Sequence, residues 1–240
     1  MKKNVSIAVL FITGLLMTAC TTLDTAALQP NKRYAVVSFY YDANILPTLG
    51  HYGRPVKIVD EKGRQLDTEP DVRRIADAFA EKFLPAFAKA APFSVIYGAQ
   101  ILRHGAYAKA APQGTRSFVA FKAIPATGYH VFQMGDFGNI GQLARDLNVD
   151  GVLVIYHHFA ASSSDNDLSN SKPGIISVIG AFDRDGKTVL QDYTSYTSRM
   201  TVRSKPGYVD IGGVSKVLVA EGDEAGRNLA KYITSKLSAK

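Results

Sequence analysis

The stretch from Asn139 to Phe159 carries the clearest alternation of hydrophobic and polar positions in the chain. Asn139 is placed to cap a helix, and Asn148 suits the helix end because asparagine tolerates a left-handed backbone there. The run Val152–Tyr156 is apolar at every position, which is typical of an inner strand covered on both faces. The helical stripe falls at i, i+3, i+4 and i+7: Ile140, Leu143, Ala144 and Leu147. The pattern therefore predicts a short helix that leads directly into a central strand.

Ahead of this unit, the pattern predicts two strands joined by a long helix. The strands are Tyr34–Tyr41 and Phe93–Tyr97. Thr68–Asp71 has a capping threonine, a proline and an aspartate, which are residues typical of a helix start. The helix that follows has one apolar stripe, made of Val72, Ile75, Phe79, Phe83, Ala86 and Phe87.

Shorter signals lie on either side of the long helix. Val56–Val59 and Arg64–Leu66 flank the turn residues Asp60–Gly63, which predicts a hairpin. Gln100–Lys109 is consistent with one further helix. Tyr129–Phe132 is expected to pair with Ser117–Phe121 as a second hairpin.

The last third of the chain predicts a polar loop, a hairpin and a closing helix. Ala160–Lys172 is the expected loop, and Ile175–Phe182 and Thr188–Val202 alternate as two antiparallel strands. Asp183–Gly186 lies between these strands and is a strong turn signal. The closing helix has Ala225, Leu229, Ile233 and Leu237 on one face. The fold class is therefore α/β (α+β), with a small mixed sheet packed against a long amphipathic helix and a C-terminal helix.

The first residues are typical of a targeting segment. Lys2 and Lys3 precede a short apolar run, and Met17-Thr18-Ala19-Cys20 resembles the processing box of bacterial lipoproteins. Cys20 is the only cysteine, so no disulfide within the chain is possible. We predict cleavage before Cys20 and acylation of its thiol, with an ordinary signal peptide as the alternative. In Gram-negative lipoproteins an aspartate after the cysteine commonly signals retention in the inner membrane, so Thr21 favours the outer membrane.

These signals divide the chain into three expected parts. Residues 1–19 are the signal peptide, 20–32 a lipidated tether, and 33–240 a single α/β domain. The net charge of +7 is too small to argue for nucleic acid. No apolar run after the leader reaches the ~18 residues that a spanning helix requires.

The residue types that support catalysis or metal binding are present without the spacing that this chemistry needs. His157 and His158 are adjacent on a strand, so they point to opposite faces and do not share a metal. The polar segment Asp165–Asn170 lacks the glycine and distal glutamate of a calcium loop. Gly135–Gly141 precedes a helix but lacks the phosphate-loop spacing, and no nucleophile motif surrounds Ser162–Ser164. We predict no catalytic residue, no metal and no cofactor.

One charge feature is unusual. No acidic residue occurs between Glu81 and Asp136, where basic residues alternate with aromatic ones. Such a surface suits an anionic partner such as lipid headgroups, cell-wall polymer or an acidic protein face, whereas the alternative is a solvated surface with its aromatic rings in the core. The candidate partner-binding residues are Arg103, Lys109, Arg116 and Lys122.

The order of elements resembles a group of envelope lipoprotein domains. The group comprises the curli-secretion lipoprotein (CsgG-like) family, the penicillin-binding-protein activator lipoproteins and the amino-terminal domain of TolB. The residues that carry the resemblance are Tyr34–Phe39, Ile75–Phe87 with Phe93–Ile96, Leu143–Asp150 with Gly151–Ile155, and Asp183–Gly186. The chain departs from the group by an insertion at about 97–135. The resemblance implies a layered α/β domain without catalytic residues that binds other envelope proteins or assembles into rings.

Three functional hypotheses follow. The first is a non-catalytic lipoprotein, held at the periplasmic side of the outer membrane by Cys20, that binds or assembles with other envelope proteins. The second is a subunit of an oligomeric secretion pore, although Phe118–Phe121 and Tyr129–Phe132 are short for the ~9–11 residues of a spanning strand. The third is a hydrolase acting on cell-wall material. Homo-oligomers fit the first two, and nucleic acid is not an expected partner in that compartment.

Overall fold

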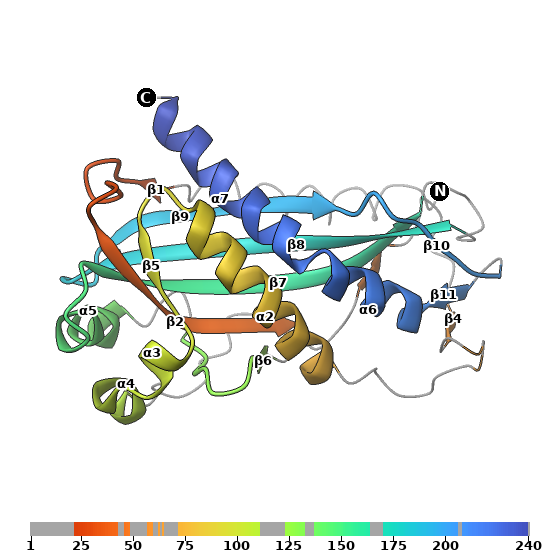
Figure 1. The fold of residues 1–240 in the computed structure, drawn as a ribbon, viewed down its shortest axis with the longest axis horizontal. Helices are drawn as coiled ribbons and strands as arrows, with labels where there is room; N and C mark the ends of the chain where they lie inside the picture. Colours follow the sequence, from red (N-terminus) through yellow and green to blue (C-terminus); the bar gives the residue numbers. More distant parts are fainter. Residues whose placement is uncertain are drawn as a thin grey trace, which may run out of the picture.

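A mixed sheet forms the centre of the molecule, and helices cover both of its faces (Figure 1). The computed structural model describes residues 22–42, 46–48, 57–59, 62, 64, 72–110, 123–132, 137–163, 170–205 and 208–239. The nine strands found in this sheet within those residues are β1 (Thr22–Leu23), β2 (Arg33–Asp42), β3 (Leu46–Thr48), β5 (Ser94–Ile96), β6 (Ala123–Pro125), β7 (Gly151–Ser163), β8 (Asn170–Asp183), β9 (Thr188–Thr197) and β10 (Val202–Arg203).

The remaining elements are helices and one small parallel pair. The helices are α2 (Val72–Ala90), α3 (Ala99–Leu102), α4 (Gly105–Lys109), α5 (Phe137–Asp146), α6 (Ile211–Ala220) and α7 (Gly222–Ser238). The pair consists of β4 (Lys57–Val59) and β11 (Tyr208–Asp210). The mixture of helices and one mixed sheet confirms the predicted α+β class.

The sheet combines a parallel half with an antiparallel half. Its order is β1-β9-β8-β7-β2-β5, in which β5, β2 and β7 are parallel and β7, β8, β9 and β1 alternate in direction. The chain leaves β2 through α2 to reach β5, and it returns through α5 to β7 on the other side of β2. Parallel strands need such crossovers, which here place α2 and α5 on opposite faces.

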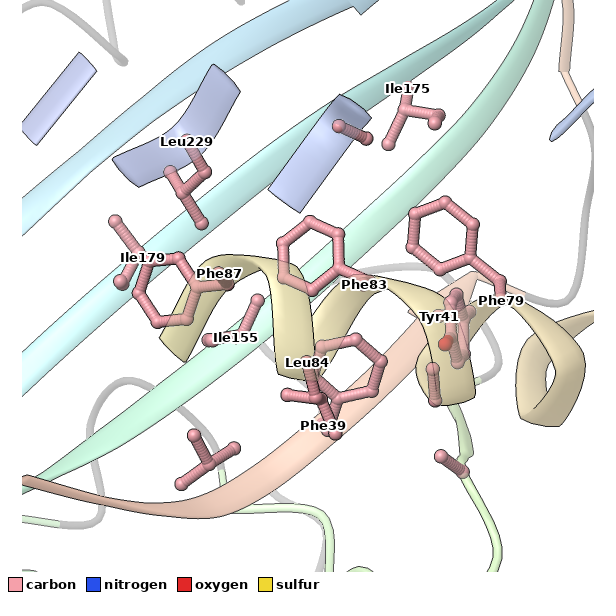
Figure 2. Packing of buried hydrophobic residues seen from close by; sticks show 14 of the residues in the cluster. Phe39, Tyr41, Phe79, Phe83, Leu84, Phe87, Ile155, Ile175, Ile179 and Leu229 are labelled. Carbon is pink, nitrogen blue, oxygen red and sulfur yellow. The ribbon is translucent and has the colours of Figure 1, made fainter. Parts of the chain in front are cut away.

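The larger core lies between the sheet and the helices α2, α6 and α7 (Figure 2). Phe79, Phe83 and Phe87 repeat every four residues along α2, and none of them is exposed to solvent. The centroid of the Phe83 ring lies 5.5 Å from that of Phe39 on β2 and 6.0 Å from that of Phe87. Burial of each such side chain contributes about 1.5–3 kcal/mol, so this row of rings stabilises the fold substantially.

The second core lies under α5, with Ile101 of α3 and Tyr107 of α4 at its margin. The apolar stripe of α5 is buried against Val152 and Val154, as the periodicity predicts. The Tyr107 hydroxyl donates a 2.9 Å hydrogen bond to the carbonyl of Val37, which ties α4 to β2. The central strand β7 is therefore covered on both faces, and this confirms its predicted inner position.

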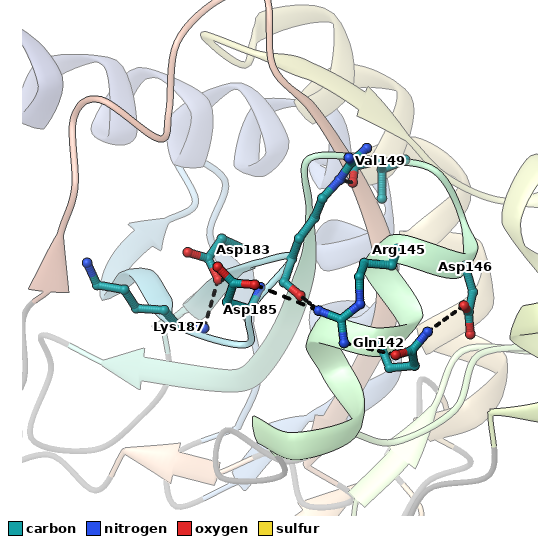
Figure 3. A network of polar contacts seen from close by, with 8 residues as sticks. Gln142, Arg145, Asp146, Val149, Asp183, Asp185 and Lys187 are labelled. Carbon is teal, nitrogen blue, oxygen red and sulfur yellow. Dashed lines mark hydrogen bonds and ion pairs between the residues drawn. The ribbon is translucent and has the colours of Figure 1, made fainter.

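Polar contacts connect α5 with the turn between β8 and β9 (Figure 3). Asp183 accepts hydrogen bonds from the backbone N–H groups of Asp185 and Lys187, each 2.9 Å long, so it forms the turn as predicted. Arg145 donates to the carbonyl of Arg184 and lies 3.8 Å from the Asp185 carboxylate. At the same contact a Cβ on Gly141 would lie 2.5 Å from the backbone nitrogen of Gly186, so the glycine permits close packing.

Several expectations about boundaries are wrong. The helix α5 begins at Phe137, so Asn139 lies inside it and does not cap it, whereas Asn148 does have a left-handed φ of 51°. The expected loop Ala160–Lys172 is partly strand, because β7 extends to Ser163 and β8 begins at Asn170. The expected helix Gln100–Lys109 is divided into α3 and α4.

Two predicted hairpins lie partly outside the described residues, and their described parts pair with other segments. Ile58 pairs in parallel with Val209 of β11, and the expected partner strand up to Leu66 lies largely outside the described residues. Ser117–Phe121 also lies outside them. Ala123–Pro125 instead forms β6, antiparallel to the end of β2, and His130 makes a bridge with Ser38. The described part of the expected insertion thus packs against β2.

The expected tether is folded from Thr22 onward. Thr22 and Leu23 pair with Gln191 and Leu190 of β9 as an antiparallel strand. Leu28 is buried in the larger core. The tether prediction relied on small polar residues, but edge pairing and one buried leucine hold this segment against the sheet.

We expect Gly226→Ala to destabilise the protein. A Cβ at this position would lie 2.5 Å from the carbonyl oxygen of Phe83 and 3.0 Å from the nitrogen of Phe87, so α7 must move away from α2. Urea unfolding should show a loss of about 1–3 kcal/mol from this overpacking, which outweighs the ~1 kcal/mol gain in helix propensity.

Gly105→Ala is the matched control, because a Cβ there would meet no atom within 4 Å. This variant should be as stable as the parent or slightly more stable. Equal stability of the Gly226→Ala variant would show that the two helices do not approach as closely as described.

Candidate functional site

The residues predicted from sequence fall in two groups. Arg103 follows α3 and Lys109 ends α4, and both side chains are exposed at the surface that these short helices form. Arg116, Lys122 and Cys20 lie outside the described residues. The structure therefore brings two of the four basic candidates onto one exposed surface.

The two adjacent histidines of β7 have different environments, because neighbouring strand residues face opposite sides of the sheet. His157 is fully buried in the larger core. Its Nδ1 lies 2.9 Å from the Ser177 hydroxyl oxygen on β8. Four rings surround it at centroid distances of 4.7–5.5 Å, namely Phe39, Tyr41, Phe79 and Phe83. Burial, and to a smaller extent the charge of His158, lower the pKa of His157 to about 3, so this imidazole is neutral.

His158 lies on the opposite face beside the carboxyl end of β2. Its Nδ1 is 3.2 Å from Oδ2 of Asp42, the last residue of that strand. Its Nε2 contacts the hydroxyl of Tyr156, and the Tyr156 ring stacks on Tyr40 with centroids 5.0 Å apart. The carboxyl ends of parallel strands are where open α/β sheets commonly bind ligands, so the trio Asp42, His158 and Tyr156 is the first candidate site.

The protonation states of this trio limit what it can do. Burial, and then the nearby Asp42 charge, raise the pKa of Tyr156 well above its usual value, so the phenol keeps its proton. Burial lowers the pKa of His158, although the Asp42 charge opposes this effect. A protonated phenol is a poor nucleophile and a poor base. The geometry therefore favours a hydrogen-bonded support for the end of β2, which sequence spacing alone did not reveal.

A second polar cluster closes the outer edge of β9. One carboxylate oxygen of Asp192 accepts from the N–H of Tyr193 at 2.9 Å, and the other accepts from the Tyr232 hydroxyl at 2.8 Å. Lys236 lies 3.3 Å from the latter oxygen. The side-chain amide of Asn228 reaches the carbonyl of Ser195 at 3.5 Å. Asp192 of β9 itself and Asn228 of α7 thus occupy two backbone groups that an open strand edge would offer to another chain.

The cluster at the β9 edge is only partly visible in the local sequence. Asn228, Tyr232 and Lys236 recur every four residues, so they lie on one face of α7. Asp192, the partner of Tyr232 and Lys236, is 40 residues away from Tyr232 along the chain. The four-residue spacing was visible in the sequence, but the pairing depends on how α7 packs against the sheet.

Metal-binding groups and membrane-spanning helices are not found in the part of the chain that the structure describes. There, no cluster of three or more His, Cys, Asp or Glu side chains has the arrangement of a metal site. Likewise, none of the described helices is both long enough and apolar enough to cross a bilayer.

Comparison with known proteins gives no family for this chain. Neither a family model nor a curated protein sequence matches it. Similar solved structures include protein XCC0632 from Xanthomonas campestris, of family DUF330, with 11% identity, a TM-score of 0.34 and coverage of 92% of this chain and 95% of that one. The hypothetical protein CT253 from Chlamydia trachomatis has 9% identity, a TM-score of 0.34 and coverage of 85% and 99%. These likenesses are too weak to support an argument, and the resemblance to CsgG-like lipoproteins stays a prediction.

Replacing His157 by phenylalanine should make the protein less sensitive to acid. The folded protein keeps this imidazole neutral to about pH 3, whereas an exposed histidine binds a proton near pH 6.5. Between these values the unfolded chain binds more protons, so stability is highest above pH 6.5 and falls as the pH decreases. When the pH is lowered from 7 to 5, the unfolding free energy of the His157→Phe variant should fall by about 2 kcal/mol less than that of the parent.

Urea unfolding at both pH values measures this difference. Ser177→Ala is the control, because it removes the hydrogen-bond partner but keeps the titrating ring. Its stability should be lower at both pH values, with the pH dependence of the parent. An identical pH dependence in the parent and His157→Phe would argue against a buried neutral histidine.

Proposed function

We propose that this protein is an outer-membrane-anchored lipoprotein whose non-catalytic α+β body binds or assembles with other proteins of the cell envelope. The observation that carries the proposal is the box Met17-Thr18-Ala19-Cys20, which ends in the only cysteine of the chain. The first described strand, β1, begins at Thr22, two residues after this cysteine. A charged and apolar leader precedes the box, as lipoprotein export requires.

The properties of the body agree with a role in binding. In the Asp42–His158–Tyr156 trio, burial raises the pKa of Tyr156, so the phenol keeps its proton and is a poor nucleophile. Arg103, directly after α3, and Lys109, at the end of α4, are exposed, so both are available to an anionic partner. Multiply acylated cysteines anchor firmly, because each buried CH₂ contributes about 0.8 kcal/mol.

Cys20→Ser should abolish acylation. We expect a precursor that retains its leader and carries no label after growth with radioactive palmitate, because the acyl chain is attached through the cysteine sulfur. Gel mobility and autoradiography measure the two effects. Lipid label on the variant would contradict the proposal.

Thr21→Asp is the matched control for this experiment. It leaves Cys20 in place and should be labelled as strongly as the parent. If the residue after the cysteine directs sorting, this variant should move from outer-membrane to inner-membrane fractions. An unchanged distribution would remove the argument for the outer membrane while leaving the lipoprotein assignment intact.

Reversing the basic candidates should weaken partner capture without unfolding the body. The variant combines glutamate substitutions of Arg103, Lys109, Arg116 and Lys122. We expect crosslinking yields in native envelopes, measured by mass spectrometry, to fall on the order of tenfold, since exposed ion pairs contribute about 0.2–1 kcal/mol each. Thermal unfolding should be unchanged, because Arg103 and Lys109 are exposed.

Lys82→Glu with Lys89→Glu serves as the comparison, because both lysines are exposed on α2 and carry the same charge. This pair should leave partner capture intact. If both variants lose capture equally, net charge matters and the α3–α4 surface does not. If neither loses it, the basic stretch is not the binding surface.

A further inference from the structure

The edge of the sheet formed by β1 and β9 lies unusually close to the expected anchor. Two peptide units separate Cys20 from Thr22, and consecutive Cα atoms are about 3.8 Å apart. The two Cα atoms are therefore at most about 7.6 Å apart, whatever path the chain takes. Thr22 is hydrogen-bonded into the sheet beside Gln191, so the anchor cannot move away from this edge while the strand remains paired.

Because the link from Cys20 to Thr22 is short compared with the headgroup layer, it determines which edge of the sheet faces the bilayer. The headgroup layer on each side of the hydrocarbon core is roughly 5–8 Å thick. A diacylated sulfur is fixed at the inner boundary of that layer, since its chains enter the hydrocarbon. Thr22 must then lie within the headgroup layer or directly above it. Neighbouring strands are about 4.8 Å apart, so β9 is brought to the same depth.

The side chains at this edge suit a membrane surface. Tyr193 lies two residues beyond Gln191 on β9 and is 42% exposed, which is high for a large aromatic residue. Tyrosine favours the headgroup level because it has an apolar ring and a polar hydroxyl. On the other side of the same edge, Lys236 lies 5.1 Å from the centre of the Tyr232 ring. Its hydrogen bonds with Tyr232 and Asp192 raise its pKa, so it remains charged and suits lipid phosphates.

The hydrogen bonds that occupy backbone groups at this edge also suit a position beside the bilayer. Asp192 and Asn228 occupy backbone groups of Tyr193 and Ser195, which leaves fewer unsatisfied polar groups to bring against a bilayer. The opposite edge of the sheet is β5, five strands away along the order β1-β9-β8-β7-β2-β5. At about 4.8 Å per strand, that edge lies roughly 24 Å from β1.

We propose that the β1–β9 edge, with Tyr193 on one side and Lys236 on the other, rests on the lipid headgroups and that the α3–α4 surface is held away from the membrane. This proposal rests on the proposed lipid anchor at Cys20. It assigns the membrane as the partner of one edge and leaves the basic α3–α4 surface for a protein partner.

The absence of tryptophan from the chain allows a direct test. Tyr193→Trp places a single indole at the edge, and Ala108→Trp places one on the exposed side of α4 as the matched control. Each acylated protein is purified from bacterial membranes and reconstituted in phosphatidylcholine vesicles with spin-labelled headgroups. We expect a blue-shifted emission from the indole at position 193 and strong quenching of it, at least about twofold stronger than at position 108. The reason is that nitroxide quenching acts over a short range, and the two sites lie several strands apart.

A second probe guards against misfolding of the first variant. Lys236→Cys gives a unique free thiol, since the thiol of Cys20 is consumed by acylation and the chain has no other cysteine. A fluorophore on this thiol should be quenched as strongly as the indole at position 193.

The outcomes separate the two proposals. Quenching at positions 193 and 236 but not at 108 supports the orientation. Equal or stronger quenching at 108 in protein that carries palmitate overturns the orientation and leaves the lipoprotein assignment standing. Protein that carries no palmitate overturns the lipoprotein assignment together with the orientation that depends on it.

Discussion

The packing of α2 against both the sheet and its neighbour α7 is the contact on which the rest of the structure depends. Phe79, Phe83 and Phe87 fill the space above β2 and β7, and each is fully buried. Gly226 lets α7 approach so closely that the carbonyl of Phe83 lies where a side chain would begin. Without this approach α7 would lie farther from α2, and Tyr232 and Lys236 would no longer be aligned with Asp192 on β9. One helix contact therefore fixes both the core and the edge of the sheet.

Local periodicity was enough to predict the elements that bury a continuous apolar stripe. The helix around Phe83, the helix around Leu143 and the strands on either side of Asp183–Gly186 were predicted because their side-chain pattern repeats over several turns or residues. The failures share a different cause. Thr22 and Leu23 become a strand only because Leu190 and Gln191 lie beside them, more than 160 residues later in the chain. Pairing partners at that distance leave no local pattern.

The same reasoning explains which parts of the candidate sites were visible. Exposed basic residues such as Arg103 and Lys109 were identified from composition alone, because charge is a property of the residue and not of its neighbours. That His157 and His158 point to opposite faces of the sheet also followed from strand geometry. The Asp42–His158 contact did not, because it joins strands 116 residues apart whose parallel pairing depends on the α2 and α5 crossovers. The sequence therefore predicted that the two histidines face opposite sides of the sheet, but not which of them is buried or what each one contacts.

The helix α7 both packs against α2 in the core and makes polar contacts with β9. Its core stripe of Ala225, Leu229 and Ile233 is buried against α2, while Asn228, Tyr232 and Lys236 form a neighbouring stripe along β9. The two stripes are offset by three residues, which places them side by side on a helix. A rotation of α7 that improved one set of contacts would weaken the other, so the apolar packing fixes where the polar stripe lies. The contact of Asn228 with Ser195 at the β9 edge thus follows from core packing, and it occupies a backbone group that an open strand edge would offer to a neighbouring chain.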